Sequence, residues 1–208
     1  MGKLLTTGLT SLLLLIALML IGITVASILT DQTIGSSSEK DLEQITEETI
    51  DEISTYLLIK DQKGKYREIN GEQKIDKIAL WITPLFNQEI DLSQLIIQLN
   101  NGETVIFLIY DGNSVNLGPN SIFDHPIWNN MNGGNFGFIS IVDMDESLVS
   151  YDTFNDCSDN AYLIFRLPEF MTLNKHEEIM VTLFPSTGIT RTIVLKAPLP
   201  IKPVVSFD

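Results

Sequence analysis

Cysteine, histidine and positive charge are scarce in this sequence. Its 208 residues include one cysteine, Cys157, and two histidines. A single cysteine excludes an intramolecular disulfide framework, and the sequence has no Cys or His pairs at zinc-binding spacing. Lys and Arg number 13 against 27 Asp and Glu, so the formal net charge is −14. We therefore expect no nucleic acid among its partners.

Motifs that carry catalysis are also missing. The sequence contains no Gly-rich phosphate loop with a lysine and no nucleophile elbow. We therefore predict that the protein is not an enzyme and that it has neither a small-molecule substrate nor an organic cofactor.

Ionisable side chains are absent between Leu4 and Thr30. This run exceeds the apolar stretch of a secretory signal, which is about 7–15 residues long. The segment from Leu9 to Leu29 reaches the length of about 20 residues that crosses a membrane. Lys3 before it and acidic residues after it indicate that the N-terminus faces the cytoplasm and the larger domain lies outside the cell. The segment is either a membrane anchor or an assembly element.

The order of residues in the segment resembles the N-terminal core helix of the archaellins, the archaeal flagellins built on a type IV pilin-like plan. It reads TTGLTSLLLLIALMLIGITVASIL from Thr6 to Leu29. The matching features are a glycine near the start, a serine, an aliphatic run with Ile-Ala-Leu-Met, and a closing Ala-Ser-Ile-Leu. A second stretch, DKIALWITPLFNQEIDLSQLIIQL, is similar to the first strand, turn and second strand of the archaellin outer domain. The two stretches occur in the order that the family has.

The resemblance implies a helical polymer whose subunits pack through this segment. Small residues let helices approach closely, and long apolar ones fill the space between them. The residues expected to pack in the filament core are Gly8, Leu12, Ile16, Ala17, Met19, Gly22, Ala26 and Leu29.

The sequence departs from the family in two respects. Archaellin precursors have a basic leader that ends in Gly, but only Met-Gly-Lys-Leu-Leu precedes Thr6 here, so the processing site stays open. Many archaellins carry glycans on Asn-x-Ser/Thr sequons, and the sequence has none.

Helical spacing continues beyond the apolar run, because Leu42, Ile45, Ile53 and Tyr56 recur at helical steps with acids between them. We predict a long N-terminal helix in residues 1–58, in which residues 33–41 are the one place for a bend. Residues 60–73 then read as a polar connection, and residues 59–208 are assigned to an outer β-domain.

Short β-branched or aromatic runs separated by turn formers follow from Lys77 onward. Seven strands are expected, at residues 77–83, 95–99, 104–110, 136–142, 161–167, 178–184 and 189–196. This spacing predicts an α+β protein in which the long hydrophobic helix precedes an Ig-like antiparallel β-sandwich. Residues 116–135 are expected to form a surface loop, and the proline-containing C-terminus an extended edge or tail.

Acidic residues cluster between residues 143 and 159. Asp143, Asp145 and Asp156 could supply oxygen ligands to a structural Ca²⁺, because calcium prefers several carboxylates from a flexible loop. The loop does not fit the EF-hand pattern, and a solvated acidic loop without metal is the competing interpretation.

The sequence therefore favours an extracellular structural subunit of the archaellum filament that serves motility, with surface adhesion as a further role open to it. Its partners would be copies of itself, with other archaellins as further candidates and the membrane holding it before assembly. Three alternatives stay open: an accessory pilin-like component of the archaellum envelope, a subunit of another type IV pilus-like adhesion filament, and a membrane-anchored extracellular binding domain that uses loops such as residues 123–136.

Overall fold

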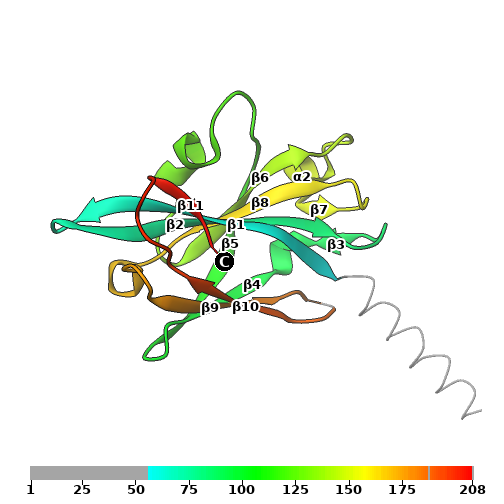
Figure 1. The fold of residues 1–208 in the computed structure, drawn as a ribbon. Coiled ribbons are helices and arrows are strands. Elements are labelled where there is room, and N and C mark those ends of the chain that lie inside the picture. Colours follow the sequence, from blue (N-terminus) through cyan, green and yellow to red (C-terminus); the bar gives the residue numbers. More distant parts are fainter. Residues whose placement is uncertain (1–55, 187, 208) are drawn as a thin grey trace, which may run out of the picture. The chain divides into compact units, whose positions relative to one another are not determined.

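A single curled β-sheet dominates the structure (Figure 1), which is a computed structural model that describes residues 56–186 and 188–207. Nine strands form this sheet in the order β10-β9-β4-β5-β6-β8-β2-β1-β11, and β3 pairs with β7 separately. The strands are β1 (Leu57–Ile69), β2 (Glu72–Pro84), β3 (Ile90–Asp91), β4 (Ile96–Asn100), β5 (Val105–Asn116), β6 (Asn135–Val142), β7 (Thr153–Phe154), β8 (Asn160–Arg166), β9 (Glu178–Phe184), β10 (Arg191–Lys196) and β11 (Val204–Ser206). Short helices connect them: η1 (Leu92–Gln94), η2 (Ile122–Asp124), η3 (Pro126–Asn129), α2 (Ser147–Tyr151) and η4 (Glu169–Met171).

The predicted Ig-like sandwich is wrong. A sandwich needs two antiparallel sheets face to face, whereas the main strands here form one continuous sheet. That sheet is not fully antiparallel either, because β5 and β6 run parallel. Its inner face closes on one core to which strands from both ends contribute, including Leu57 in β1 and Leu195 in β10.

The predicted α+β class also fails for the described residues, which are mostly β and include one short α-helix, α2. The long N-terminal helix was assigned to residues 1–58, and nearly all of these lie outside the described residues. Its expected end at Leu58 is wrong, because Leu57 and Leu58 already belong to β1 and pair with β2. The division of the chain at residues 58 and 59 stays a prediction.

β1 and β2 form a long hairpin where the sequence suggested a polar connection. The turn consists of Asn70 and Gly71, whose φ angles are +55° and +82°. Two-residue hairpin turns of this kind need positive φ at both positions, which Asn-Gly supplies at low cost. The polar composition of β1 is compatible with a strand because its neighbours on both sides, β2 and β11, complete its hydrogen bonding.

The outer face of β6, β8 and β2 is covered by residues 117–134, which were expected to form a surface loop. Phe123, Ile127, Trp128 and Met131 are buried there, and a second apolar cluster forms beneath them against residues such as Ile164 of β8. The segment contains no strand, as expected, but it packs on the sheet instead of standing in solvent.

The C-terminal segment returns across β1 and ends in the edge strand β11, in agreement with the expected extended edge (Figure 1). Phe207 is buried behind it, and Gly64 of β1 leaves the space for its ring. Within the part of the chain that the structure describes, no helix is long and apolar enough to cross a membrane.

Candidate functional site

The residues predicted to pack in a filament core all precede the described part of the chain. They are Gly8, Leu12, Ile16, Ala17, Met19, Gly22, Ala26 and Leu29. Their role stays a prediction.

The acidic segment between β6 and β8 is an ordered loop that contains α2 and β7. The carboxylate of Asp143 accepts hydrogen bonds from the backbone N–H groups of Ser147 at 3.0 Å and Leu148 at 3.1 Å. Asp145 accepts one from the side-chain amide of Asn155 at 2.6 Å. These bonds satisfy backbone donors at the start of α2 and tie the two halves of the loop together.

Asp159, and not the predicted Asp156, completes the group of neighbouring carboxylates. Asp143, Asp145 and Asp159 each have one carboxylate oxygen in this group, and the three oxygens lie within 4.8 Å of one another. Asp159 is 2% exposed, and its Oδ2 accepts hydrogen bonds from the backbone N–H groups of Asn155 and Asp156. Asp156 instead accepts a hydrogen bond from the backbone N–H of Ser158 at 2.7 Å.

Two of these carboxylates have shifted pKa values in opposite directions. The hydrogen bond from Asn155, together with donors at Ser147, lowers the pKa of Asp145 to about 2. Burial raises the pKa of Asp159, and the nearby charges of Asp143 and Asp145 act in the same direction. Close carboxylates of this kind suit a cation, but Ca²⁺ takes six to eight oxygens, and most oxygens of this group already accept hydrogen bonds from the protein. The calcium site therefore stays a hypothesis, with Asp159 as the third carboxylate.

Tyr110 of β5 fastens the acidic loop to the sheet. Its hydroxyl donates to the carboxylate of Asp152, which follows α2, and the hydroxyl of Ser114 donates to the same oxygen at 3.0 Å. Burial raises the pKa of Tyr110, so the phenol keeps its proton at physiological pH. Loop and sheet are thus joined by a polar contact in a part-buried position.

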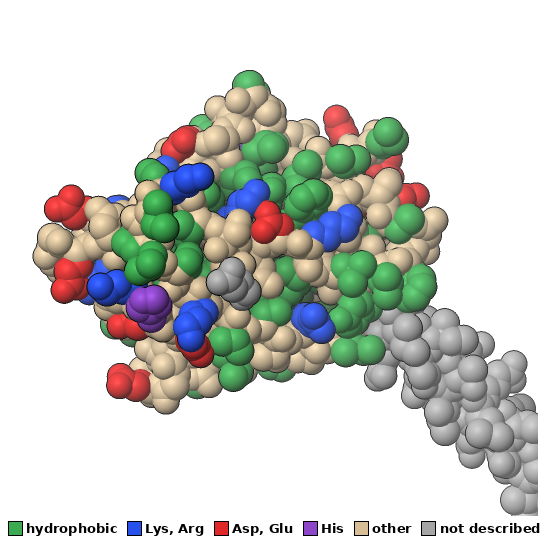
Figure 2. Space-filling model, in the orientation of Figure 1, with side chains coloured by type: hydrophobic (Ala, Val, Ile, Leu, Met, Phe, Trp, Pro, Cys, Tyr) green, Lys and Arg blue, Asp and Glu red, His purple; other side chains and the backbone are tan. Residues whose placement is uncertain are grey.

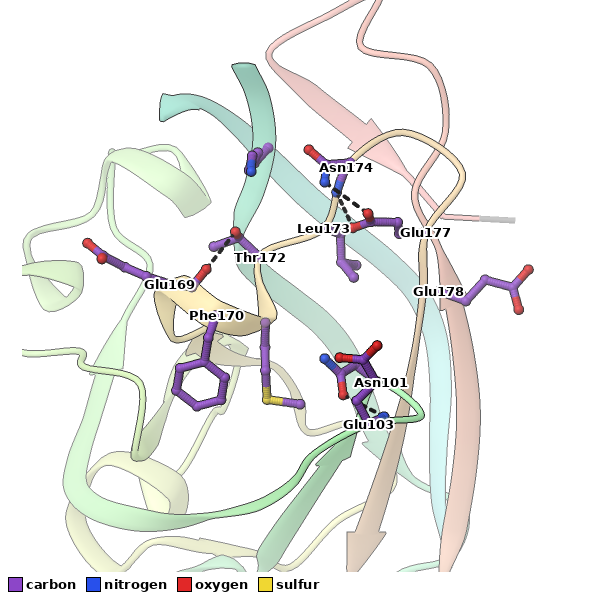
Figure 3. A pocket seen from close by; sticks show the side chains of 11 residues that line it. Asn101, Glu103, Glu169, Phe170, Thr172, Leu173, Asn174, Glu177 and Glu178 are labelled. Atoms are coloured by element: carbon purple, nitrogen blue, oxygen red, sulfur yellow. Dashed lines mark hydrogen bonds between the residues drawn. The ribbon is translucent and has the colours of Figure 1, made fainter. Parts of the chain in front are cut away.

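An open hollow of about 420 Å³ lies between the β4–β5 turn and the segment from η4 to β9 (Figure 3). Its charged lining consists of Lys74, Glu103, Glu169, Glu177 and Glu178. Glu177 accepts hydrogen bonds from Asn174, and Glu178 pairs with Lys196 at 2.7 Å. Phe170, which is 65% exposed, lies at the same hollow. Excess carboxylate beside an exposed ring suits a cationic or amphipathic side chain.

Positive and apolar side chains gather on the face that carries β1 and the C-terminal segment (Figure 2). Most acidic side chains in this view lie near the outline of the domain.

Two curated flagellins resemble this chain in sequence. Flagellin B3 of Methanocaldococcus jannaschii is 24% identical over 198 residues, which cover 92% of this chain and 89% of that protein. Flagellin B5 of Pyrococcus abyssi is 32% identical over 84 residues, and this match spans 38% of each protein's length.

Two solved structures share the fold. The crystal structure of flagellin FlaB1 from Methanocaldococcus jannaschii matches with a TM-score of 0.64 and 24% identity, over 73% of this chain and 95% of that one. A subunit of the archaeal flagellum of Methanospirillum hungatei matches with a TM-score of 0.50 and 11% identity, over 92% of this chain and 93% of that one.

The family comparison spans both the apolar N-terminal run and the β-domain. The model of the archaeal-type flagellin family matches residues 6–195, which is most of the chain. This chain belongs to the archaeal-type flagellin family.

Proposed function

We propose that this chain is a structural subunit that polymerises into the archaellum, the archaeal flagellum that drives motility. The observation that carries the proposal is the family match, which extends unbroken from the apolar run at Thr6 to β10. The fold shared with flagellin FlaB1 and with a flagellum subunit supports it.

In this role the chain acts by assembly and not by catalysis. Copies of the same chain are its principal partners, and other archaellins are further partners in the same filament. The assembled subunit lies at the cell surface. Before assembly the apolar run from Leu9 to Leu29 holds it in the membrane, because a charge-free stretch of this length is stable in lipid. In the filament the same run lies against its counterparts, where burying apolar surface contributes about 25 cal/mol per Å².

Filament composition tests the proposal. Cells that encode the chain are sheared, and the released filaments and the remaining membranes are analysed separately by quantitative mass spectrometry. We expect the chain as a major component of the filaments, with peptides from the β-domain at subunit stoichiometry. Recovery with the membranes alone would replace the proposal with an accessory envelope component or an anchored binding domain.

A further inference from the structure

The outer face of β5, β4, β9 and β10 is apolar and uncovered by any described residue. Alternate residues of β5 point outward, and Phe107 and Ile109 are 59% and 62% exposed. The strand register places Ile96 opposite Ile109, and Val194 opposite Met180. The apolar face consists of Ile96, Val105, Phe107, Ile109, Met180 and Val194, each of which is more than two-fifths exposed.

Charge is absent from the positions between these residues. In the same register lie Gln98, Asn100, Thr182 and Thr192, which are polar but neutral. The neighbouring outer face, over β6, β8 and β2, is covered by residues 117–134 of the same chain. A contiguous exposed apolar surface commonly marks an interaction site. Here the exposed apolar surface ends at the strands that residues 117–134 cover.

The open hollow lined by Glu103, Glu169, Glu177 and Glu178, here called the acidic hollow, adjoins one end of the apolar face. Glu103 precedes Val105 in the chain, and Glu178 lies two residues before Met180 on the same side of β9. Glu178 is paired with Lys196, whereas Glu103 and Glu169 form no ion pair with any residue that the structure describes. An occupant of the whole surface should therefore be mainly apolar and carry positive charge at the end that meets Glu103 and Glu169.

The C-terminal segment, residues 199–204, has this chemistry on its own exposed side. Leu199, Ile201 and Val204 are exposed, Ile201 by 82%, and Lys202 is the one charged residue among them. We propose that the apolar face binds residues 199–204 of a second copy of this chain, with Lys202 directed toward Glu103 and Glu169 of the acidic hollow. The apolar face and residues 199–204 are different surfaces, so two copies in contact still have one unoccupied apolar face and one unoccupied C-terminal segment. Further copies add through the same contact, and the result is an open polymer when the contacts do not close into a ring. The inference rests on the proposed function and names the contact between β-domains that the function requires.

Mixed disulfide cross-linking of full-length chains tests the contact. One preparation carries Phe107→Cys and the other Ile201→Cys, both with Cys157→Ser to remove the exposed native thiol. We expect disulfide-linked dimers when the two preparations are assembled together and oxidised, because each variant supplies one half of the bond. A matched mixture of Met144→Cys with Ile201→Cys should give none, because Met144 is exposed but lies in the acidic loop beyond the end of β6, beside Asp145 and Asn155, and is not part of the apolar face. Equal yields from the two mixtures, or no dimers from the first, would overturn the proposal.

A charge placed in the face provides a second readout. Phe107→Glu should reduce the yield of sheared filaments by about tenfold or more, since burying an unpaired carboxylate opposes assembly. Met144→Glu should leave the yield unchanged. Thermal unfolding of both variants should match the parent protein, because neither side chain is in the core. Normal assembly of Phe107→Glu contradicts the proposed contact and leaves the filament function intact, whereas failure of the unmodified chain to form filaments contradicts the function itself.

Thiol labelling of the Phe107→Cys variant distinguishes a second copy from a cover within the same chain. We expect the introduced thiol to react rapidly with a soluble maleimide in the monomer and to be protected in the filament. If this thiol already resists labelling in the monomer, the face is covered within one chain and the proposal is overturned.

Discussion

Carboxylates in the loop between β6 and β8 act mainly as hydrogen-bond acceptors for their own backbone. Asp143 and Asp159 each receive two backbone N–H donors, and Asp145 receives the Asn155 amide. Hydrogen bonds from backbone N–H groups to aspartate side chains therefore order this acidic loop. Such bonds depend on the folded path of the backbone, so they could not be predicted from the sequence.

Ionisation of Asp145 should contribute to stability in acid. Its pKa in the folded protein is about 2, below its ordinary value of 3.8, so this contribution is complete above about pH 4 and is lost as the pH falls toward 2. Asp145→Asn should show a smaller drop in melting temperature over that window than the parent protein. Glu68→Gln, at an exposed site in β1, serves as the control and should follow the parent profile. Identical profiles for Asp145→Asn and the parent would contradict this assignment.

The calcium hypothesis makes a prediction that separates Asp159 from Asp156. An ion that binds only the folded state stabilises it by an amount that grows with the logarithm of the ion concentration once this exceeds the dissociation constant, so added Ca²⁺ should raise the melting temperature and a chelator should reverse the rise. Asp159→Asn should abolish the response and Asp156→Asn should retain it, because the structure groups Asp159 with Asp143 and Asp145. A melting temperature that does not respond to Ca²⁺ would leave the loop as a metal-free acidic turn.

Two of the three grouped carboxylates can be recognised from the sequence, and the third is harder to see. Asp143 and Asp145 stand together before α2, whereas Asp159 lies directly before the next strand. Its carboxylate accepts hydrogen bonds from the backbone N–H groups of Asn155 and Asp156, which precede it in the loop. An aspartate directly before an apolar strand was the available signal.

All seven predicted strands occur, as β2, β4, β5, β6, β8, β9 and β10. Their β-branched and aromatic runs are strong local signals. β1 was missed because Lys60 to Glu68 is almost entirely polar, although the Asn70-Gly71 turn after it is a typical hairpin turn. Its strand conformation depends on pairing with β2 and β11, which a single segment cannot display.

Gly64 should be intolerant of substitution. A Cβ atom there would lie 2.9 Å from Cζ of Phe207 and 3.0 Å from Cγ2 of Ile75. Gly64→Ala should lower the free energy of unfolding by about 1–3 kcal/mol, the usual effect of overpacking. Chemical denaturation measures the change, and adding Phe207→Leu should recover part of it because the smaller side chain vacates the space. An additive loss in the double variant would show that the contact does not cause the effect.

The covering segment should contribute strongly to stability through Trp128. This side chain is 2% exposed, its indole N–H donates to the carbonyl of Ile122 at 2.7 Å, and the ammonium of Lys77 lies 4.8 Å from its ring centroid. Trp128→Ala should cost about 3–5 kcal/mol in denaturant unfolding. Phe170→Ala, at an exposed ring, provides the control and should change little. If both variants lose a similarly small amount of unfolding free energy, the packing of residues 117–134 on the sheet contributes little to stability.

Closure of the nine strands into one curled sheet was beyond sequence reasoning. Seven short strands with regular turns equally suit two sheets, so a sandwich was the natural expectation. The parallel pairing of β5 with β6 instead keeps these strands in one sheet. It requires a long crossover connection, and residues 117–134 provide it by packing across the outer face of the sheet. Such a long connection carries no local signature of which strand it joins.

This chain combines an apolar N-terminal run with a strongly acidic overall composition, and the family match covers the run and most of the β-domain. Like charges on neighbouring copies repel, so assembly depends on surfaces that are free of charge or complementary in charge. The apolar run and the neutral face of β5, β4, β9 and β10 both meet that condition.

Electron cryo-microscopy of filaments sheared from native cells would show whether this chain builds the archaellum. We expect a helical polymer into whose repeating outer density the curled nine-stranded domain of residues 57–207 fits, with side chains that match this sequence. Filaments built from a different chain, with this one retained in the membrane fraction, would contradict this expectation.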